Sequence, residues 1–176
     1  MLPSKVSKLL SKPRNTVRRL TMQSLTKFTP LLLLGVLLVT AAHALETKSV
    51  INPEHLADTT QYGYSQATVV SAGSQIVYVA GQIGISDLGP NDFRSQVDRS
   101  FENLAAVLAA SGSSADDVVR ITLLVKGMDE EKLAYLVEKR RSFFGAEPPA
   151  STLIPVPELA LPSLNFEIDA IAVMGD

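Results

Sequence analysis

The clearest pattern in the chain is a helical period of apolar residues between positions 97 and 108. The apolar side chains recur three or four positions apart, on one face of a 3.6-residue period: Val97, Phe101, Leu104, Ala105 and Leu108. Asn91 or Asp92 can cap the first turn, and Gly112 suits the left-handed conformation that ends many helices. The sequence therefore predicts a helix between these caps.

A second helix is predicted to begin at Asp129. Glu130 and Glu131 fall in its first turn, where negative charge interacts favourably with the helix dipole, and Gly145 can end it. Its apolar face would consist of Leu133, Leu136, Val137, Phe143 and Phe144.

Alternating apolar and polar residues predict strands around these helices. Two short β-branched and aromatic runs, residues 64–70 and 75–80, flank the turn sequence Ala72-Gly73-Ser74 and are predicted to pair as a hairpin. Between the helices, apolar side chains occupy every second position of residues 119–125. Two further strands are predicted at residues 151–156 and 165–174.

The predicted order is β-β-α-β-α-β-β, an α+β fold in which two helices cover one face of a sheet in two layers. Residues 62–176 would form this domain. Residues 45–61 are polar and without a clear period, which predicts a loosely held N-terminal arm.

The first 44 residues differ from the rest of the chain in charge. They hold seven of the 16 basic residues and none of the 18 acidic ones, so residues 1–44 carry +7 and residues 45–176 carry −9. A basic stretch ending at Lys27, an apolar run of about a dozen residues from Leu31 and the sequence Ala42-His43-Ala44 are typical of a secretory signal peptide. Since a bilayer span needs about 20 apolar residues, cleavage after Ala44 is predicted rather than a permanent membrane anchor.

Two alternatives concern this segment. Met22 begins a more compact signal peptide and is an alternative start of translation. Residues 1–28 are basic, contain Ser and Thr and lack acids, which is also typical of an organelle transit peptide. The prediction is a periplasmic or secreted protein, with an organelle as the alternative destination.

Composition excludes several kinds of site. The chain has no cysteine, which rules out disulfides, thiol nucleophiles and thiolate metal sites. After cleavage His55 is the one remaining histidine, so neither a histidine metal cluster nor a histidine-based triad can form. Gly81-Gln82-Ile83-Gly84 opens no predicted helix, unlike a phosphate-binding loop. We therefore expect no cofactor and no metal, and the charge of −9 argues against nucleic acid as a partner.

Glu167 is a candidate for catalysis because acidic residues are disfavoured inside strands. It lies within the last predicted strand, where alternation places it with Asp169 on the face opposite Phe166 and Ile168. A carboxylate held there could orient a water molecule as a general base. The alternative is that the two acids form a solvent-facing pair on an exposed face of the sheet.

Arg140 and Arg141 are candidates for binding an acid. Both fall near the C-terminal end of the second predicted helix, where positive charge is favoured by the helix dipole. Either guanidinium could extend into a pocket, or the two could form a solvated pair.

Five segments resemble the RidA family (reactive intermediate deaminase, YjgF-like) and occur in the same order. They are Tyr64-Ser-Gln-Ala67, Val79-Ala-Gly-Gln82, Phe101-Glu-Asn-Leu104-Ala-Ala-Val-Leu108, Asp117-Val-Val-Arg120 and Phe166-Glu-Ile-Asp-Ala-Ile-Ala172. The resemblance covers roughly residues 62–174. It implies a chorismate-mutase-like fold and a homotrimer with small-molecule clefts between subunits. For the active subgroup it also implies hydrolysis of 2-imino acids to 2-keto acids and ammonia.

The resemblance also implies roles for individual residues. Tyr64 is similar to the family's pocket tyrosine, Gly81 to a backbone donor and Glu167 to the acid that orients the attacking water. The active subgroup binds the substrate carboxylate with an arginine in the motif Pro-Ala-Arg-Ser, whereas this chain has Ala150-Ser151-Thr152. The site predicted on this basis comprises Glu167 as the catalytic residue and, for substrate binding, Tyr64, Ala80, Gly81, Val137, Ser151 and Thr152.

Three of these positions depart from the family's pattern. Ser151 stands at the position of the arginine, Ala80 at that of a serine and Val137 at that of an asparagine. A guanidinium binds a carboxylate through two charge-assisted hydrogen bonds, which serine cannot replace. Two functions follow: hydrolysis of 2-imino acids or related imines and enamines with another cation, or binding of a small metabolite by a non-catalytic homotrimer.

Overall fold

The computed structural model describes residues 47–174, so the predicted signal peptide lies outside the described residues. This part of the chain contains six strands, two α-helices and one short 3-10 helix. In order they are β1 (Lys48–Ile51), η1 (Thr60–Tyr62), β2 (Ala67–Val70), β3 (Ile76–Ile83), α2 (Phe93–Ala110), β4 (Val118–Lys126), α3 (Glu130–Phe144), β5 (Ala150–Val156) and β6 (Phe166–Val173).

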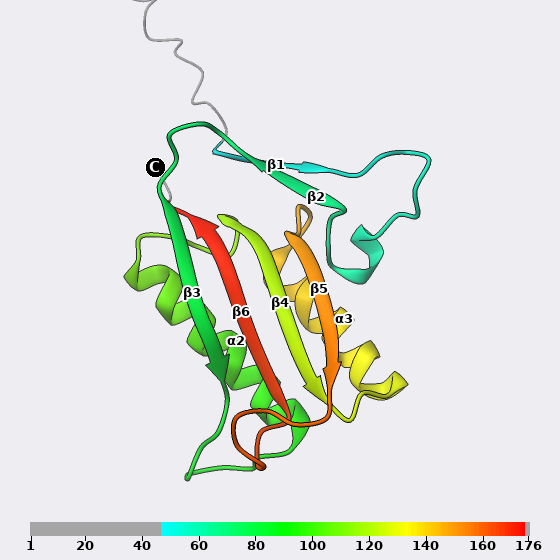
Figure 1. Ribbon diagram of the computed structural model, residues 1–176, viewed down its shortest axis with the longest axis vertical. Coiled ribbons are helices and arrows are strands. Elements are labelled where there is room, and N and C mark those ends of the chain that lie inside the picture. The colour runs from blue at the N-terminus through cyan, green and yellow to red at the C-terminus, as the bar shows by residue number, and fades with distance from the viewer. Residues whose placement is uncertain (1–46, 175–176) are drawn as a thin grey trace, which may run out of the picture. The chain divides into compact units, whose positions relative to one another are not determined.

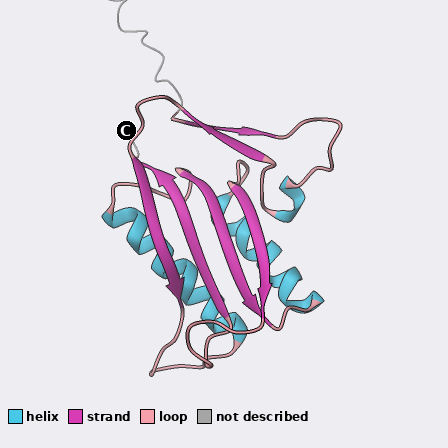
Figure 2. Cartoon of the chain, viewed as in Figure 1, coloured by secondary structure: helices cyan, strands magenta, loops and turns pink. Residues whose placement is uncertain are grey.

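A four-stranded sheet with two helices on one face forms the centre of the domain (Figure 1). The strand order is β3-β6-β4-β5. β6 pairs antiparallel with β3 and β4, whereas β4 and β5 are parallel and are joined through α3. Both helices lie behind the sheet in Figure 2, and no helix of residues 47–174 covers the other face. The α+β class and the arrangement of the helices are confirmed.

The core forms between the sheet and the helices because each element presents one apolar face. On the sheet side Ile121 and Ile168 are fully buried, and on the helix side Leu104 and Leu136 are fully buried. Phe101 of α2 joins the two layers. Neither helix of residues 47–174 is long and apolar enough to cross a membrane.

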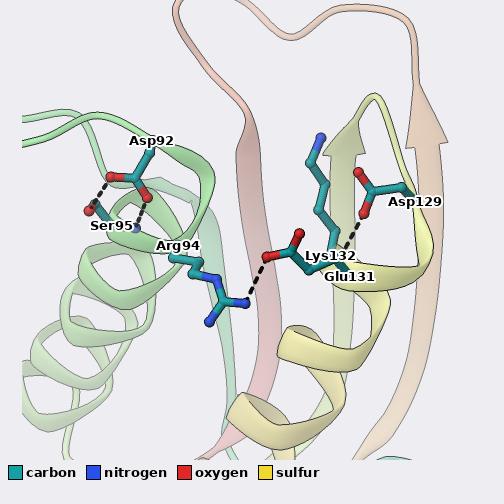
Figure 3. Close-up of polar contacts among 6 residues, drawn as sticks. All are labelled: Asp92, Arg94, Ser95, Asp129, Glu131 and Lys132. Carbon is teal, nitrogen blue, oxygen red and sulfur yellow. Dashed lines mark hydrogen bonds and ion pairs between the residues drawn. The ribbon is translucent and has the colours of Figure 1, made fainter.

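The predicted caps are confirmed at both helix starts (Figure 3). The carboxylates of Asp92 and Asp129 each accept a hydrogen bond from the backbone N–H three residues later, at 3.1 and 2.8 Å. Arg94 in the first turn of α2 donates to Glu131 in the first turn of α3 at 2.9 Å. The two helices therefore begin side by side.

The predicted hairpin is wrong in its pairing. Gly73 does form the turn, with φ of 91°, but β2 then pairs with β1, and β3 pairs with β6. β3 has eight residues and its inward side chains Val77 and Val79 extend the core, whereas β2 has four residues. A turn reverses the chain locally, while the partner of a strand is decided by the apolar surface that the pairing buries.

The N-terminal arm is more ordered than predicted. Lys48–Ile51 forms β1, and the Nζ of Lys48 donates to the backbone oxygen of Val118 at 3.0 Å. The 3-10 helix η1 follows and ends at Gly63, immediately before Tyr64. This segment therefore belongs to the folded domain and brings Tyr64 to one edge of the sheet.

Candidate functional site

The structure divides the predicted site residues into two groups. One group lines a single pocket: Tyr64, Val137 and Ser151. The other group lies outside that pocket: Ala80, Gly81, Thr152 and Glu167. Alternation along β5 and β6 places Thr152 and Glu167 on the sheet face that points away from the helices, which we call the open sheet face.

The pocket lies between α3, β5 and residues 58–64, with a volume of about 1340 Å³, and we call it the α3–β5 pocket. α3 contributes side chains about one turn apart, among them Leu133 and Val137. β5 contributes alternate side chains: Ser151, Leu153 and Pro155.

Tyr64 is positioned by backbone contacts on both sides. The N–H of Ser65 donates to the carbonyl of Pro149 at 2.9 Å, which holds this segment beside the start of β5. Gly63 has φ of 75°, and a Cβ there would lie 2.8 Å from the Cβ of Arg140. Glycine therefore allows the end of η1 to approach the last turns of α3, which brings Tyr64 next to Arg140.

Arg140 is the guanidinium that reaches Ser151. Its side chain is 3% exposed, and its Nη1 donates to the Oγ of Ser151 at 3.3 Å. Its Nε donates to the carbonyl of Leu136 at 3.3 Å, and its Cζ lies 5.6 Å from the centre of the Tyr64 ring. Arg141 also lines the pocket, but its side chain is exposed. Both arginines therefore line the pocket, and Arg140 is the one that contacts Ser151.

The electrostatic setting of Arg140 is unusual for a buried cation. No carboxylate of residues 47–174 lies within ion-pair distance of it. Burial lowers the pKa of Arg140 from its ordinary value, and the neighbouring Tyr64 opposes this shift. Arginine nevertheless stays protonated in proteins, and a buried charge without a counter-ion is costly. The pocket therefore holds a positive charge that is available to an anion.

The sequence did carry a signal for the position of Arg140. Leu133, Val137 and Arg140 are spaced four and three residues apart, so they share one face of α3. Because Val137 already belonged to the predicted site, this spacing pointed Arg140 toward the same pocket.

Glu167 is held against a bulge in β3. Pairing with β6 moves from Val79 opposite Ala170 to Gln82 opposite Ile168, which leaves Ala80 and Gly81 within the bulge. A Cβ at Gly81 would overlap Oε1 of Glu167 and lie 2.8 Å from its Cδ. The glycine therefore makes room for the Glu167 carboxylate.

Comparison with known proteins supports the resemblance seen in the sequence. Residues 56–174 match the endoribonuclease L-PSP family. Protein DfrA of Myxococcus xanthus is 38% identical over 114 residues, which cover 62% of this chain and 84% of that protein. A 2-iminobutanoate/2-iminopropanoate deaminase of Rattus norvegicus is 31% identical over 116 residues, covering 64% and 80% of the two chains.

A solved structure agrees with these matches. The Rid family protein YyfB of Yersinia pestis superposes with a TM-score of 0.68 at 32% identity, over 72% of this chain and 98% of that one. The matched residues 56–174 include both groups of predicted site residues. The chain therefore belongs to the endoribonuclease L-PSP family, which includes the RidA and YjgF proteins.

Proposed function

We propose that the α3–β5 pocket binds the carboxylate of a 2-imino acid through Arg140, and that the protein hydrolyses this compound to a 2-keto acid and ammonia. The observation that carries the proposal is the buried Arg140 guanidinium, which contacts Ser151 and has no carboxylate partner within residues 47–174. Relatives named 2-iminobutanoate/2-iminopropanoate deaminase support the class of reaction.

Arg140 would replace the cation that the family's pattern places at position 151. The Ser151 hydroxyl accepts a hydrogen bond from Arg140, so the guanidinium on α3 occupies the neighbourhood of the position where the resemblance expects an arginine side chain. A charge-assisted hydrogen bond contributes about 1.5–3 kcal/mol. Loss of one such bond would weaken carboxylate binding by about 10- to 150-fold.

A homotrimer would bring Glu167 to this pocket. Glu167 lies on the open sheet face, where Tyr78 is 79% exposed and Ile154 is 41% exposed. Burying such a face against further copies of the chain is favourable. If the open face of one copy met the α3–β5 pocket of the next, Glu167 and Arg140 would act on the same ligand.

In the proposed reaction, Glu167 of one subunit accepts a proton from a water molecule while the water oxygen adds to C2 of the imino acid. Glu167 returns this proton to the imine nitrogen, which gives a neutral carbinolamine. Transfer of the carbinolamine hydroxyl proton to its nitrogen through Glu167 then accompanies cleavage of the C–N bond. Ammonia leaves and the keto acid remains, with no change of oxidation state. Arg140 and Ser151 hold the carboxylate throughout, so their contribution is orientation of C2 toward the water.

The direct test is hydrolysis of 2-iminopropanoate, generated in place and followed with semicarbazide as a trap. We expect the purified protein to accelerate hydrolysis and Arg140→Met to raise KM by about 10- to 150-fold. Arg94→Met is the matched control, because Arg94 is an exposed arginine outside the pocket lining, and its KM should change little. An unchanged KM in Arg140→Met would refute the role of Arg140.

The second candidate function is binding of a small metabolite without turnover. It is favoured by one observation: within a single protomer, Glu167 does not line the pocket that contains Arg140. Binding that survives Glu167→Ala, in a protein that does not accelerate imine hydrolysis, would support this function over the first.

We also propose that the protein is exported to the periplasm or secreted, on the strength of the charge, the apolar run and the Ala42-His43-Ala44 sequence. N-terminal sequencing of the mature protein should give Leu45 as its first residue. A start at Met22 or a cut at another position would revise the boundary, and recovery from an organelle would favour the transit peptide.

A further inference from the structure

We infer that the α3–β5 pocket selects acids with a branched apolar side chain over the shortest 2-imino and 2-keto acids. The inference rests on the proposed function in one respect, because it takes Arg140 as the anchor of the carboxylate. It adds the class of substrate, which follows from the order in which polar and apolar side chains occur along the pocket.

On the helix side, polarity changes along one face of α3. With a rise of about 1.5 Å per residue, Val137 lies about 4.5 Å and Leu133 about 10.5 Å from Arg140 along the helix axis. Both side chains line the pocket, and Leu133 is 44% exposed there. A ligand anchored at Arg140 therefore meets apolar surface one turn away and again two turns away.

The strand side repeats this order. β5 begins at Ala150, shortly after α3 ends at Phe144, so the strand runs back along the helix from the Arg140 end. Ser151, Leu153 and Pro155 line the pocket at intervals of about 6.6 Å. From the Arg140 end, the pocket therefore continues with apolar side chains on its helix side, at Val137, and on its strand side, at Leu153.

Of the five charged residues that line the pocket, three are acidic and oppose a second carboxylate on the ligand, and Arg141 is the one cation besides Arg140. Asp58, Glu130 and Glu138 line it, with Glu138 only two residues before Arg140 on α3, and none of the three forms an ion pair with a described residue. A dicarboxylic acid anchored at Arg140 would place its second charge near these acids and against apolar side chains. Such a ligand should therefore bind more weakly than an apolar acid of similar length.

The test compares three keto acids, which carry the same carboxylate and do not turn over. Calorimetry on the purified full chain would measure Kd for 2-oxopropanoate, 4-methyl-2-oxopentanoate and 2-oxopentanedioate. Burial of one methylene changes affinity by about fourfold, so we expect the branched acid to bind at least about tenfold more tightly than the shortest one. The dicarboxylate should bind more weakly than the branched acid.

Leu133→Ser removes apolar surface from the far part of the pocket at a partly exposed position, where the fold should tolerate serine. It should reduce the preference for the branched acid severalfold. The matched control is Leu88→Ser, because Leu88 is 98% exposed and lies outside the pocket lining. The control should keep the preference of the unaltered protein.

The outcomes separate this inference from the proposed function. Equal affinities, a preference for 2-oxopropanoate or a preference unaffected by Leu133→Ser would overturn the inference, as would absence of binding by all three acids. Hydrolysis of 2-iminopropanoate that depends on Arg140 would leave the proposed function intact in those cases. A clear preference for the branched acid without any imine hydrolysis would support the inference and refute the hydrolysis.

Discussion

Arg140 in the α3–β5 pocket and Glu167 on the open sheet face are opposite charges in different settings. In the pocket, Arg140 is almost fully buried and donates to neutral oxygens of Leu136 and Ser151. On the open face, Glu167 is half-buried and lies over Gly81. One region can anchor a carboxylate and the other can orient water, but neither does both.

We expect the buried Arg140 to lower the stability of the fold more than the half-buried Glu167 does. Burying a guanidinium without a counter-ion costs free energy, whereas a carboxylate on a half-exposed face loses less hydration. A ligand carboxylate would provide the missing counter-ion of Arg140. If the proposed function holds, a ligand stabilises the pocket, and another copy of the chain stabilises the open face.

The largest effect is expected from Glu167→Gln, which keeps the shape of the side chain and removes the general base. Hydrolysis of 2-iminopropanoate should fall by about 10²- to 10⁴-fold in kcat. The matched control is Asp169→Asn, because Asp169 lies on the same face of β6 and should not be required. Loss of assembly in Glu167→Gln, measured by light scattering, would instead make Glu167 structural.

Mixing Glu167→Gln and Arg140→Met chains, assayed at substrate concentrations well below KM, tests whether the two regions meet across subunits. Assemblies formed from equal amounts of Glu167→Gln and Arg140→Met chains would combine both intact residues at about a quarter of their interfaces. Activity should therefore return to roughly that fraction of the unaltered protein. If assemblies that are shown to be mixed do not recover activity, then either Glu167 and Arg140 of one subunit act together, or the two residues do not act on the same ligand.

A smaller effect is expected from Gly81→Ala. The added Cβ would displace the Glu167 carboxylate, and misplacement by about 1 Å can cost about 100-fold, so we expect a loss of about 10- to 100-fold in kcat. Thermal unfolding should change little, because the displaced atoms are at the end of a flexible side chain. Gly89→Ala provides the control, since its Cβ would meet only the side chain of Arg99, at 3.9 Å. Full activity in Gly81→Ala would show that this position of Glu167 is not the functional one.

The smallest effect concerns stability. Arg140→Met replaces a buried cation with an apolar side chain of similar length, so the melting temperature should be equal to or higher than that of the unaltered protein. Differential scanning calorimetry without ligand is the measurement, with Arg141→Met as the exposed control. A clearly lower melting temperature in Arg140→Met alone would mean that Arg140 stabilises the fold, which would contradict the interpretation that its charge lacks a counter-ion until a ligand binds.

Side-chain spacing predicted those features that depend on a single segment of the chain. The helix caps at Asp92 and Asp129 and the buried faces of α2 and β4 follow from side-chain spacing and are confirmed. The partner of β3 did not follow, because the turn at Gly73 is compatible with more than one pairing. The resemblance identified the family, yet it placed the functional cation at position 151, where the chain has serine.

The sequence by itself determined the class of the fold, the buried faces of α2 and β4 and the family to which the chain belongs. The predicted apolar face of α3 is correct for Leu136 and Phe144, whereas Leu133 is 44% exposed. Only the tertiary structure decided that Arg140 meets Ser151, eleven positions further along the chain, and that Glu167 lies against Gly81 and outside the α3–β5 pocket. The physical reason is that spacing specifies the face on which a side chain lies. Whether Arg140 and Ser151 are close to each other depends, in contrast, on how α3 and β5 pack antiparallel to bury their apolar faces.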